Sequence, residues 1–140
     1  MELSPRLYKW LVRPEWFPEL CIGNVLKSRF DFNNKTVLDF GSGVGTNCSM
    51  FKPSNYIGID CNLKRVRYAK YLYPNYNFDV IKDSHVPLPG NSVDYVIVVS
   101  VLHHITPDEL TSYLYEFRRV LKPNGSVICY RTLLLNRFRI

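Results

Sequence analysis

The sequence lacks the features that mark membrane-spanning, metal-binding and disulfide-stapled proteins. Its longest apolar run, residues 96–102, is broken by Ser100 and is far too short to cross a bilayer. No two of the four cysteines form a Cys-x-x-Cys pair, and the adjacent His103 and His104 have no partner at zinc-site spacing. Residues 1–5 include an acid and a proline and lack the apolar region of a secretion signal. We therefore expect no membrane span, no metal, buried free thiols and a cytoplasmic protein.

Acidic residues are absent after Glu116, although six lysines and arginines follow it. The formal net charge is +6, and a second basic cluster consists of Lys64, Arg65, Arg67 and Lys70. Basic surfaces can attract nucleic acid or anionic membranes, but more often such charges form a solvated helix face. Because no nucleic-acid-binding motif accompanies these charges, we favour the solvated face.

Apolar, β-branched runs alternate with helical patterns along the chain. Strands are expected at residues 36–40, 56–60, 77–81, 94–100 and about 126–133. Helices are expected in two pieces within residues 5–29, after a glycine-rich turn to about Met50, over residues 63–72 and over residues 107–121. Strands that alternate with helices form a parallel sheet, and a strand that is apolar on both faces suits its centre. The sequence therefore predicts an α/β fold with a doubly wound, mostly parallel sheet.

Local signals mark the expected helix ends. Asn62 is a suitable N-cap. Residues 106–109, Thr-Pro-Asp-Glu, combine a capping threonine, a proline at the first helical position and the glutamate of a capping box. Residues 122–125, Lys-Pro-Asn-Gly, end that helix with a turn. Its apolar face is expected to comprise Leu110, Leu114, Phe117 and Leu121.

A glycine-rich turn follows the first expected strand, at the edge of a parallel sheet where ligands bind. Residues 41–45, Gly-Ser-Gly-Val-Gly, permit a tight turn and a close ligand approach. A dinucleotide fingerprint would need a further glycine at Thr46, which counts against a nicotinamide-dependent dehydrogenase. Asp60 ends the second strand, where a carboxylate can accept both hydroxyls of a ribose. The alternative for Asp60 is a charge favoured by the dipole of the following helix.

Taken together, these segments resemble the class I S-adenosylmethionine-dependent methyltransferases, and in particular their small-molecule, type 11-like subgroup. The matching segments are residues 37–45, 56–60, 83, 88–96, 101–105 and 121–125. They occur in the order and spacing of the family and extend over residues 36–129. The resemblance implies a Rossmann-like fold and S-adenosyl-L-methionine as the cofactor.

The resemblance also implies a role for each matched position. The methionine part of the cofactor would be held by Asp39, Gly41, Ser42 and Gly43, and its amino end would lie along Ser100. The ribose would be held by Asp60, and the adenine by Cys61, Asn62, Asp83 and Ser84. Methyl transfer requires mainly positioning and, for some acceptors, a base. The catalytic residue is unknown, with His103 and His104 as weak candidates, because this dipeptide recurs in the family whatever the substrate.

The C-terminal end departs from the family, whose sheet usually has seven strands and ends in an antiparallel hairpin. This chain stops about ten residues after its fifth strand begins, so we expect about five strands, with the hairpin missing. An open edge on strand five, beside the apolar residues 133–135, would favour a homodimer or association with another chain. Residues 1–35 are expected to form a helical arm that packs near the cofactor, with Tyr8 as a contact, and residues 36–140 the cofactor-binding domain.

Four functions are therefore open, and the weakest of them is the nicotinamide-dependent dehydrogenase considered above. The leading one is a methyltransferase that acts on an unidentified small molecule. The first alternative is a cofactor-binding or degenerate methyltransferase-like module without turnover. The second alternative, an RNA-directed methyltransferase, is suggested by the basic residues near the C-terminus. It is disfavoured because residues 100–103, Ser-Val-Leu-His, replace the Asn/Asp-Pro-Pro-Tyr-type tetrapeptide of nucleic-acid amino methyltransferases.

Overall fold

The computed structural model describes residues 22–131 and 134–138 of the chain. Its strands are β1 (Val37–Phe40), β2 (Tyr56–Asp60), β3 (Asn77–Val80), β4 (Val93–Val99), β5 (Leu121–Arg131) and β6 (Leu134–Phe138). Its helices are α2 (Asn24–Arg29), α3 (Leu63–Leu72) and α4 (Pro107–Val120), with 3₁₀ turns η2 (Cys48–Met50), η3 (Pro53–Asn55) and η4 (Leu102–His104). Of the predicted N-terminal arm, α2 and the loop after it fall within the described residues, whereas Tyr8 lies outside them.

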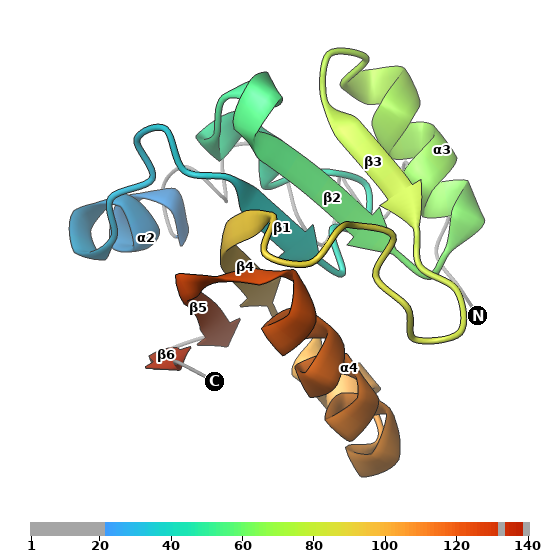
Figure 1. Ribbon diagram of the computed structural model, residues 1–140. Coiled ribbons are helices and arrows are strands. Elements are labelled where there is room, and N and C mark those ends of the chain that lie inside the picture. Colours follow the sequence, from blue (N-terminus) through green and yellow to red (C-terminus); the bar gives the residue numbers. More distant parts are fainter. Residues whose placement is uncertain (1–21, 132–133, 139–140) are drawn as a thin grey trace.

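The strands form one sheet in the order β3-β2-β1-β4-β5-β6 (Figure 1). β1 lies between β2 and β4, and all neighbours from β3 to β5 are parallel. The chain thus winds outward from β1 in both directions, and such a switch point leaves a crevice beyond the carboxyl ends of β1 and β4. The predicted doubly wound, Rossmann-like α/β fold is confirmed.

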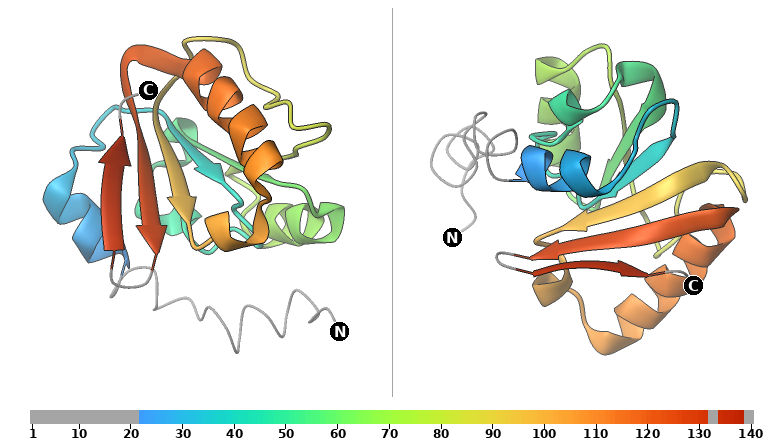
Figure 2. Two further views of the ribbon diagram at one scale, coloured as in Figure 1. Left: turned by 90° about the horizontal axis from the view of Figure 1, so that it is seen from below. Right: turned by 90° about the vertical axis from the view of Figure 1, so that its left-hand side faces the viewer.

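The expected open edge of strand five is wrong. β6 pairs antiparallel with β5, from Val127↔Phe138 to Arg131↔Leu134, and the two strands lie side by side in Figure 2. Residues 134–138 supply partners to backbone groups of β5 that would otherwise be free. An antiparallel strand is therefore present where we expected the hairpin to be missing, and the predicted association through the edge of strand five has no free edge to use.

The sheet separates two apolar cores. On one face, Val66 of α3 packs in a cluster with Tyr56 and with Leu26 of α2. On the other face, Phe117 of α4 packs in a cluster with Leu38. Val37, the neighbour of Leu38, belongs to the first cluster, as the alternation of side chains along a strand requires. Within the described residues, no helix is long and apolar enough to span a membrane.

The predicted caps are confirmed at α3 and α4. The Asn62 side chain accepts the backbone N–H groups of Lys64 and Arg65, at 3.0 and 3.2 Å. At α4, the Thr106 N–H donates to the Glu109 carboxylate at 2.9 Å, and the Glu109 N–H donates to the Thr106 hydroxyl at 3.4 Å. These bonds satisfy N–H groups that have no partner inside the helix.

Two expectations about helices need correction. Leu114 was expected on the buried face of α4, but it is 40% exposed, and the face is set instead by Phe117 and the half-buried Tyr113. After the glycine-rich turn the chain forms turns and the single 3₁₀ turn η2, which ends at Met50, rather than an α-helix. Gly43 and Gly45 hold positive φ angles, which a right-handed helix does not allow, and so the helix cannot begin there.

Candidate functional site

The glycine-rich turn after β1 is held against the end of β2. The N–H groups of Gly41 and Ser42 both donate to the carbonyl oxygen of Ile59, at 2.8 and 2.9 Å. Gly41 has a φ of +76°, and a Cβ at this position would overlap the side chain of Val101, which follows β4. Glycine is therefore required at residue 41 both by conformation and by space. These contacts fix the turn in the crevice between β1 and β4.

Asp60, the last residue of β2, joins this turn to the start of α3. One carboxylate oxygen, Oδ2, accepts the N–H of Gly43 at 2.9 Å, and Oδ1 accepts the N–H of Asn62 at 2.8 Å. The residue is only 6% exposed. A carboxylate offers about four acceptor positions, so these two bonds leave capacity for further donors such as hydroxyl groups.

A pocket of about 490 Å³ opens at this point. The predicted site residues that line it are Gly41, Ser42, Gly43, Asp60, Cys61, Ser100 and His104. The predicted residues that do not line it are Asp39, Asn62, Asp83 and Ser84, and the side chain of His103 lies outside the described part of the structure. Sequence and structure therefore agree on the glycine-rich turn, on the end of β2 and on the residue after β4.

Residues 38–129 match the model of a family described as a methyltransferase domain. The chain belongs to this family. It is 31% identical over 113 residues to the sterol 24-C-methyltransferase of Pneumocystis carinii, a match that covers 74% of this chain and 29% of that protein. The chain thus spans less than a third of the length of this curated relative.

Solved structures show the same fold. PH0226 from Pyrococcus horikoshii superposes with a TM-score of 0.74 at 26% identity, over 88% of this chain and 61% of that one. An S-adenosylmethionine-dependent methyltransferase from Aquifex aeolicus superposes with a TM-score of 0.70 at 24% identity, over 91% of this chain and 72% of that one.

The residues of the pocket fit S-adenosylmethionine, on which the Aquifex aeolicus methyltransferase depends. Gly43 has a φ of +57°, and a Cβ there would meet no atom within 4 Å, so its backbone borders open space. The Asp60 carboxylate lies beside that space, with acceptor capacity for the ribose hydroxyls. The glycine-rich turn and Asp60 are therefore the residues best placed to hold the cofactor.

Asp39 makes internal contacts in this methyltransferase domain. Its side chain is fully buried, and Oδ2 accepts the Tyr56 hydroxyl at 2.6 Å and the Asn47 side-chain amide at 3.2 Å. A short O–H···O bond to a carboxylate is among the stronger hydrogen bonds of proteins. Asp39 therefore ties β1 to β2 and to the residues after the glycine-rich turn. Its predicted role in holding the methionine part stays a prediction.

Three of the predicted contact residues have strained backbones. Asp83, Ser84 and Ser100 have φ angles of +50°, +55° and +55°, and non-glycine residues in this region are concentrated at functional sites. The Ser100 N–H donates to the carbonyl of Tyr130 on β5, at 2.8 Å, which holds this residue at the mouth of the crevice. The proposed contacts of these residues with the cofactor stay predictions.

The first turns of α4 supply pocket residues that the sequence reasoning missed. Glu109 and Tyr113 both line the pocket, as does Arg65 of α3. Hydrogen bonds from Thr106 lower the pKa of Glu109, so this side chain is a carboxylate at neutral pH. Desolvation raises the pKa of Tyr113, against a hydrogen bond with Ser84, so its hydroxyl stays protonated. The sequence could have indicated both residues of α4. A helix that follows the loop after a strand begins at the edge of the sheet where ligands bind, and Glu109 and Tyr113, four residues apart, lie on the same face of that helix.

The cysteines do not all conform to the expectation of buried thiols. Cys48 is buried and Cys129 is half-buried, but Cys61 is exposed, and all three are free. Cys21 lies outside the described residues. Desolvation and, after it, the charge of Asp60 raise the pKa of the Cys61 thiol, which keeps it protonated and a poor nucleophile. Cys61 therefore lines the pocket without acting as a reactive thiol.

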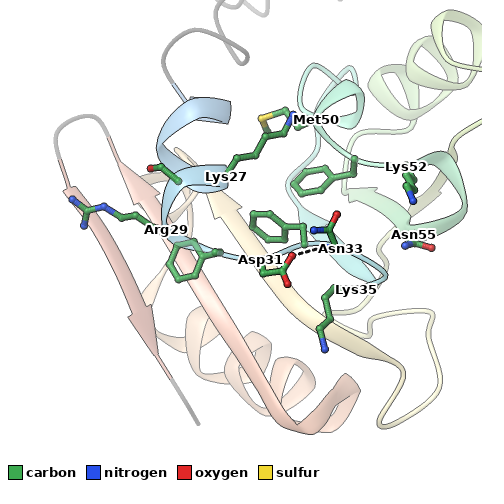
Figure 3. A pocket seen from close by; sticks show the side chains of 12 residues that line it. Lys27, Arg29, Asp31, Asn33, Lys35, Met50, Lys52 and Asn55 are labelled. Carbon is green, nitrogen blue, oxygen red and sulfur yellow. Dashed lines mark hydrogen bonds between the residues drawn. The ribbon is translucent and has the colours of Figure 1, made fainter.

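A second pocket, of about 640 Å³, lies at the opposite end of the strands (Figure 3). It is formed by the loops that precede β1 and β2, with residues 27–35 on one side and 50–55 on the other. Asp31 accepts the N–H of Asn33 within it, at 2.9 Å. Because it lies at the amino ends of the strands and contains none of the predicted site residues, it is separate from the cofactor site.

Proposed function

We propose that this chain binds S-adenosylmethionine in the pocket beyond β1 and β4 and transfers its methyl group to a small organic molecule. The observation that carries the proposal is the pairing of Gly43 and Asp60. It places a carboxylate with spare acceptor capacity next to an open stretch of glycine backbone, inside a pocket closed on its other side by α4. Cofactor binding and the choice of a small-molecule acceptor are tested by separate experiments.

The residues of the pocket suit methyl transfer by positioning. The sulfonium group of the bound cofactor supplies an already activated methyl group, so the chain needs to align the acceptor rather than create a nucleophile. The carboxylates of Asp60 and Glu109 complement the positive charge of a sulfonium. The Tyr113 hydroxyl remains available as a hydrogen-bond donor to an acceptor oxygen or nitrogen. His104 also lines the pocket and stays, together with His103, a candidate for a base.

The size and walls of the pocket favour a small acceptor. Its volume of about 490 Å³ lies within the usual range for sites that bind small ligands, and the cofactor takes up part of that space, so little is left for an acceptor. Apolar side chains make up much of the wall, namely Phe40, Ile81, Val99, Val101 and Ile105. The curated relative is named for methylation of a sterol, which is also a small apolar molecule. A cofactor-binding module without turnover is the principal alternative, because the same contacts would hold the cofactor without an acceptor.

Titration calorimetry with S-adenosylhomocysteine tests cofactor binding directly, with NAD as the control ligand. We expect S-adenosylhomocysteine to bind and to raise the melting temperature by mass action, and NAD to do neither. Binding of NAD without binding of either methionine derivative would overturn the proposal. Turnover is then tested by S-adenosylhomocysteine release with a panel of small alcohols, amines and thiols, so that binding without release identifies the non-catalytic alternative.

We also propose a cytoplasmic location and a homodimer. The free thiols of Cys48, Cys61 and Cys129 suit a reducing compartment. β6 is the outermost strand of the described sheet, and an outer strand is a template for pairing with a second copy. Cell fractionation and light scattering test these two points, and a membrane-bound or strictly monomeric chain would contradict them.

A further inference from the structure

The outer face of α3 combines cations and aromatic rings without any acid. Lys64, Arg67, Tyr68 and Tyr71 follow the i, i+3, i+4, i+7 spacing of one helix face. That face is opposite the buried residues of the helix, Val66 and Ala69. Lys64, Arg67 and the neighbouring Lys70 are exposed, and Tyr71 is 74% exposed. A large exposed ring therefore lies among several exposed cations on this face.

The charge of α3 opposes the stability of the helix itself. Its first turn contains Lys64 and Arg65 and no acid, although the helix dipole favours negative charge at that end. In α4, by contrast, Asp108 and Glu109 lie in the first turn and basic residues in the last. The chain therefore follows the dipole rule in one helix and breaks it in the other. Residues that break a local rule without a structural gain mark functional surfaces.

The two tyrosines are arranged as a stacking platform. The rings of Tyr68 and Tyr71 are nearly parallel, with an interplanar angle of 21° and centroids 6.3 Å apart. The nearest acid along the chain after the helix, Asp79 on β3, lies on the other face of the sheet, because its neighbour Phe78 belongs to the core under α3. The positive charge of this face is thus not neutralised from within the helix or from β3.

From these observations we propose that the outer face of α3 binds single-stranded nucleic acid. Cations that follow a backbone of phosphates, together with aromatic rings on which bases stack, are the means by which proteins bind single strands without sequence preference. An anionic membrane fits this face less well, because the apolar side of α3 is already buried against the sheet and cannot enter a bilayer. α3 lies over the β3 edge of the sheet (Figure 1), with solvent on its outer side. The proposal concerns binding and is independent of which molecule is methylated.

Fluorescence anisotropy with fluorescein-labelled polyuridine RNA tests this surface in the full chain at low salt. The double variant Lys64→Ala/Arg67→Ala should bind the RNA more weakly, and the slope of log affinity against log salt should become shallower by roughly 1 to 1.5, because single strands lose about 0.7 per phosphate contact. The matched control is Lys52→Ala/Arg118→Ala, which removes the same charge from two other exposed cations. It should bind with nearly the affinity of the unchanged chain.

Substitutions of Tyr71 separate stacking from charge. Tyr71→Ala should weaken RNA binding about fivefold or more, whereas Tyr71→Phe, which keeps the ring, should bind normally. The proposal would be overturned if Lys64→Ala/Arg67→Ala and the control Lys52→Ala/Arg118→Ala lost the same RNA affinity, or if Tyr71→Ala bound RNA as tightly as the unchanged chain. Sedimentation with vesicles of phosphatidylcholine and phosphatidylserine covers the membrane alternative, and binding to vesicles but not to RNA would refute the assignment. Circular dichroism of each variant checks that the fold is unchanged.

Discussion

Replacing Asp60 by asparagine tests whether one carboxylate both shapes the glycine-rich turn and holds the cofactor. Each of its oxygens accepts a backbone N–H, from Gly43 at 2.9 Å and from Asn62 at 2.8 Å. The amide of asparagine has one acceptor oxygen and one NH₂ donor. Whichever way the amide is turned, its NH₂ group must therefore face one of the two N–H donors. Asp60→Asn thus loses one charge-assisted hydrogen bond and places a donor opposite a donor.

The expected magnitude follows from the bond that is lost. A hydrogen bond to a charged group contributes about 1.5–3 kcal/mol, and Asp60 is buried enough, at 6% exposure, for water to replace that bond only poorly. The free energy of unfolding should fall by about this amount. If the carboxylate also accepts the ribose hydroxyls, the affinity for S-adenosylhomocysteine should fall by roughly ten- to a hundredfold.

Urea unfolding followed by circular dichroism measures the first quantity, and titration calorimetry at a temperature where the variant is folded measures the second. Asp108→Asn is the matched control, because Asp108 is an exposed acid in the first turn of α4. It should change stability by less than about 1 kcal/mol and leave cofactor affinity unchanged. A destabilised Asp60→Asn variant with unaltered affinity would show that Asp60 only clamps the turn, and the reasoning about the ribose would be refuted.

Three further perturbations test the described contacts. Glu116, whose pKa is lowered to about 2 by hydrogen bonds from Arg119, should stabilise the fold above its usual pKa of 4.5, and this contribution should disappear as the pH falls through 2. This contribution to the free energy of unfolding is at most roughly 3 kcal/mol, and solvent screening reduces it. When the stability of Glu116→Gln is measured against pH, this pH-dependent contribution should be missing. Tyr56→Phe should cost about 1.5–3 kcal/mol in urea unfolding because it removes the 2.6 Å bond to Asp39; an unchanged midpoint would contradict that bond. Amides of residues 127–131 should exchange with deuterium no faster than those of β4, since β6 covers them; faster exchange would contradict the hairpin.

The elements that the sequence predicted well are those determined by local chemistry. α3 begins at an asparagine cap and α4 at a capping box, and both signals depend on residues only two or three positions apart. β2 agrees with its prediction because Tyr56–Asp60 is a short apolar run bounded by turn residues. The glycine-rich turn was also placed correctly, because its residues have positive φ angles, which favour glycine whatever the rest of the fold.

The predictions that were wrong concern features that are determined by contacts between residues far apart in the sequence. Leu114 was assigned to the buried face of α4 by its spacing, but that face is rotated toward Tyr113 and Phe117, whose rings contact Phe40 at centroid distances of 4.6 and 4.9 Å. Spacing alone cannot show which side of a partly apolar helix meets an aromatic cluster from another strand. β6 was missed because the apolar residues 133–135 were interpreted as an uncovered patch beside strand five, whereas residues 134–138 pair with β5 as a strand.

Asp39 and Asp60 differ in their position along the strand, and with it in what their carboxylates contact. Both lie near the carboxyl end of a parallel strand, and the resemblance to methyltransferases assigned both to the cofactor. Asp60 is the final residue of β2, so its side chain reaches the turn and lines the pocket. Asp39 is followed by Phe40, which remains in β1, and it shares a face with Val37, where it meets the hydroxyl of Tyr56. Alternation alone would put both acids on one face, because Asp39 pairs with Gly58, two residues before Asp60. The position at the end of the strand is therefore what directs the Asp60 carboxylate into the pocket.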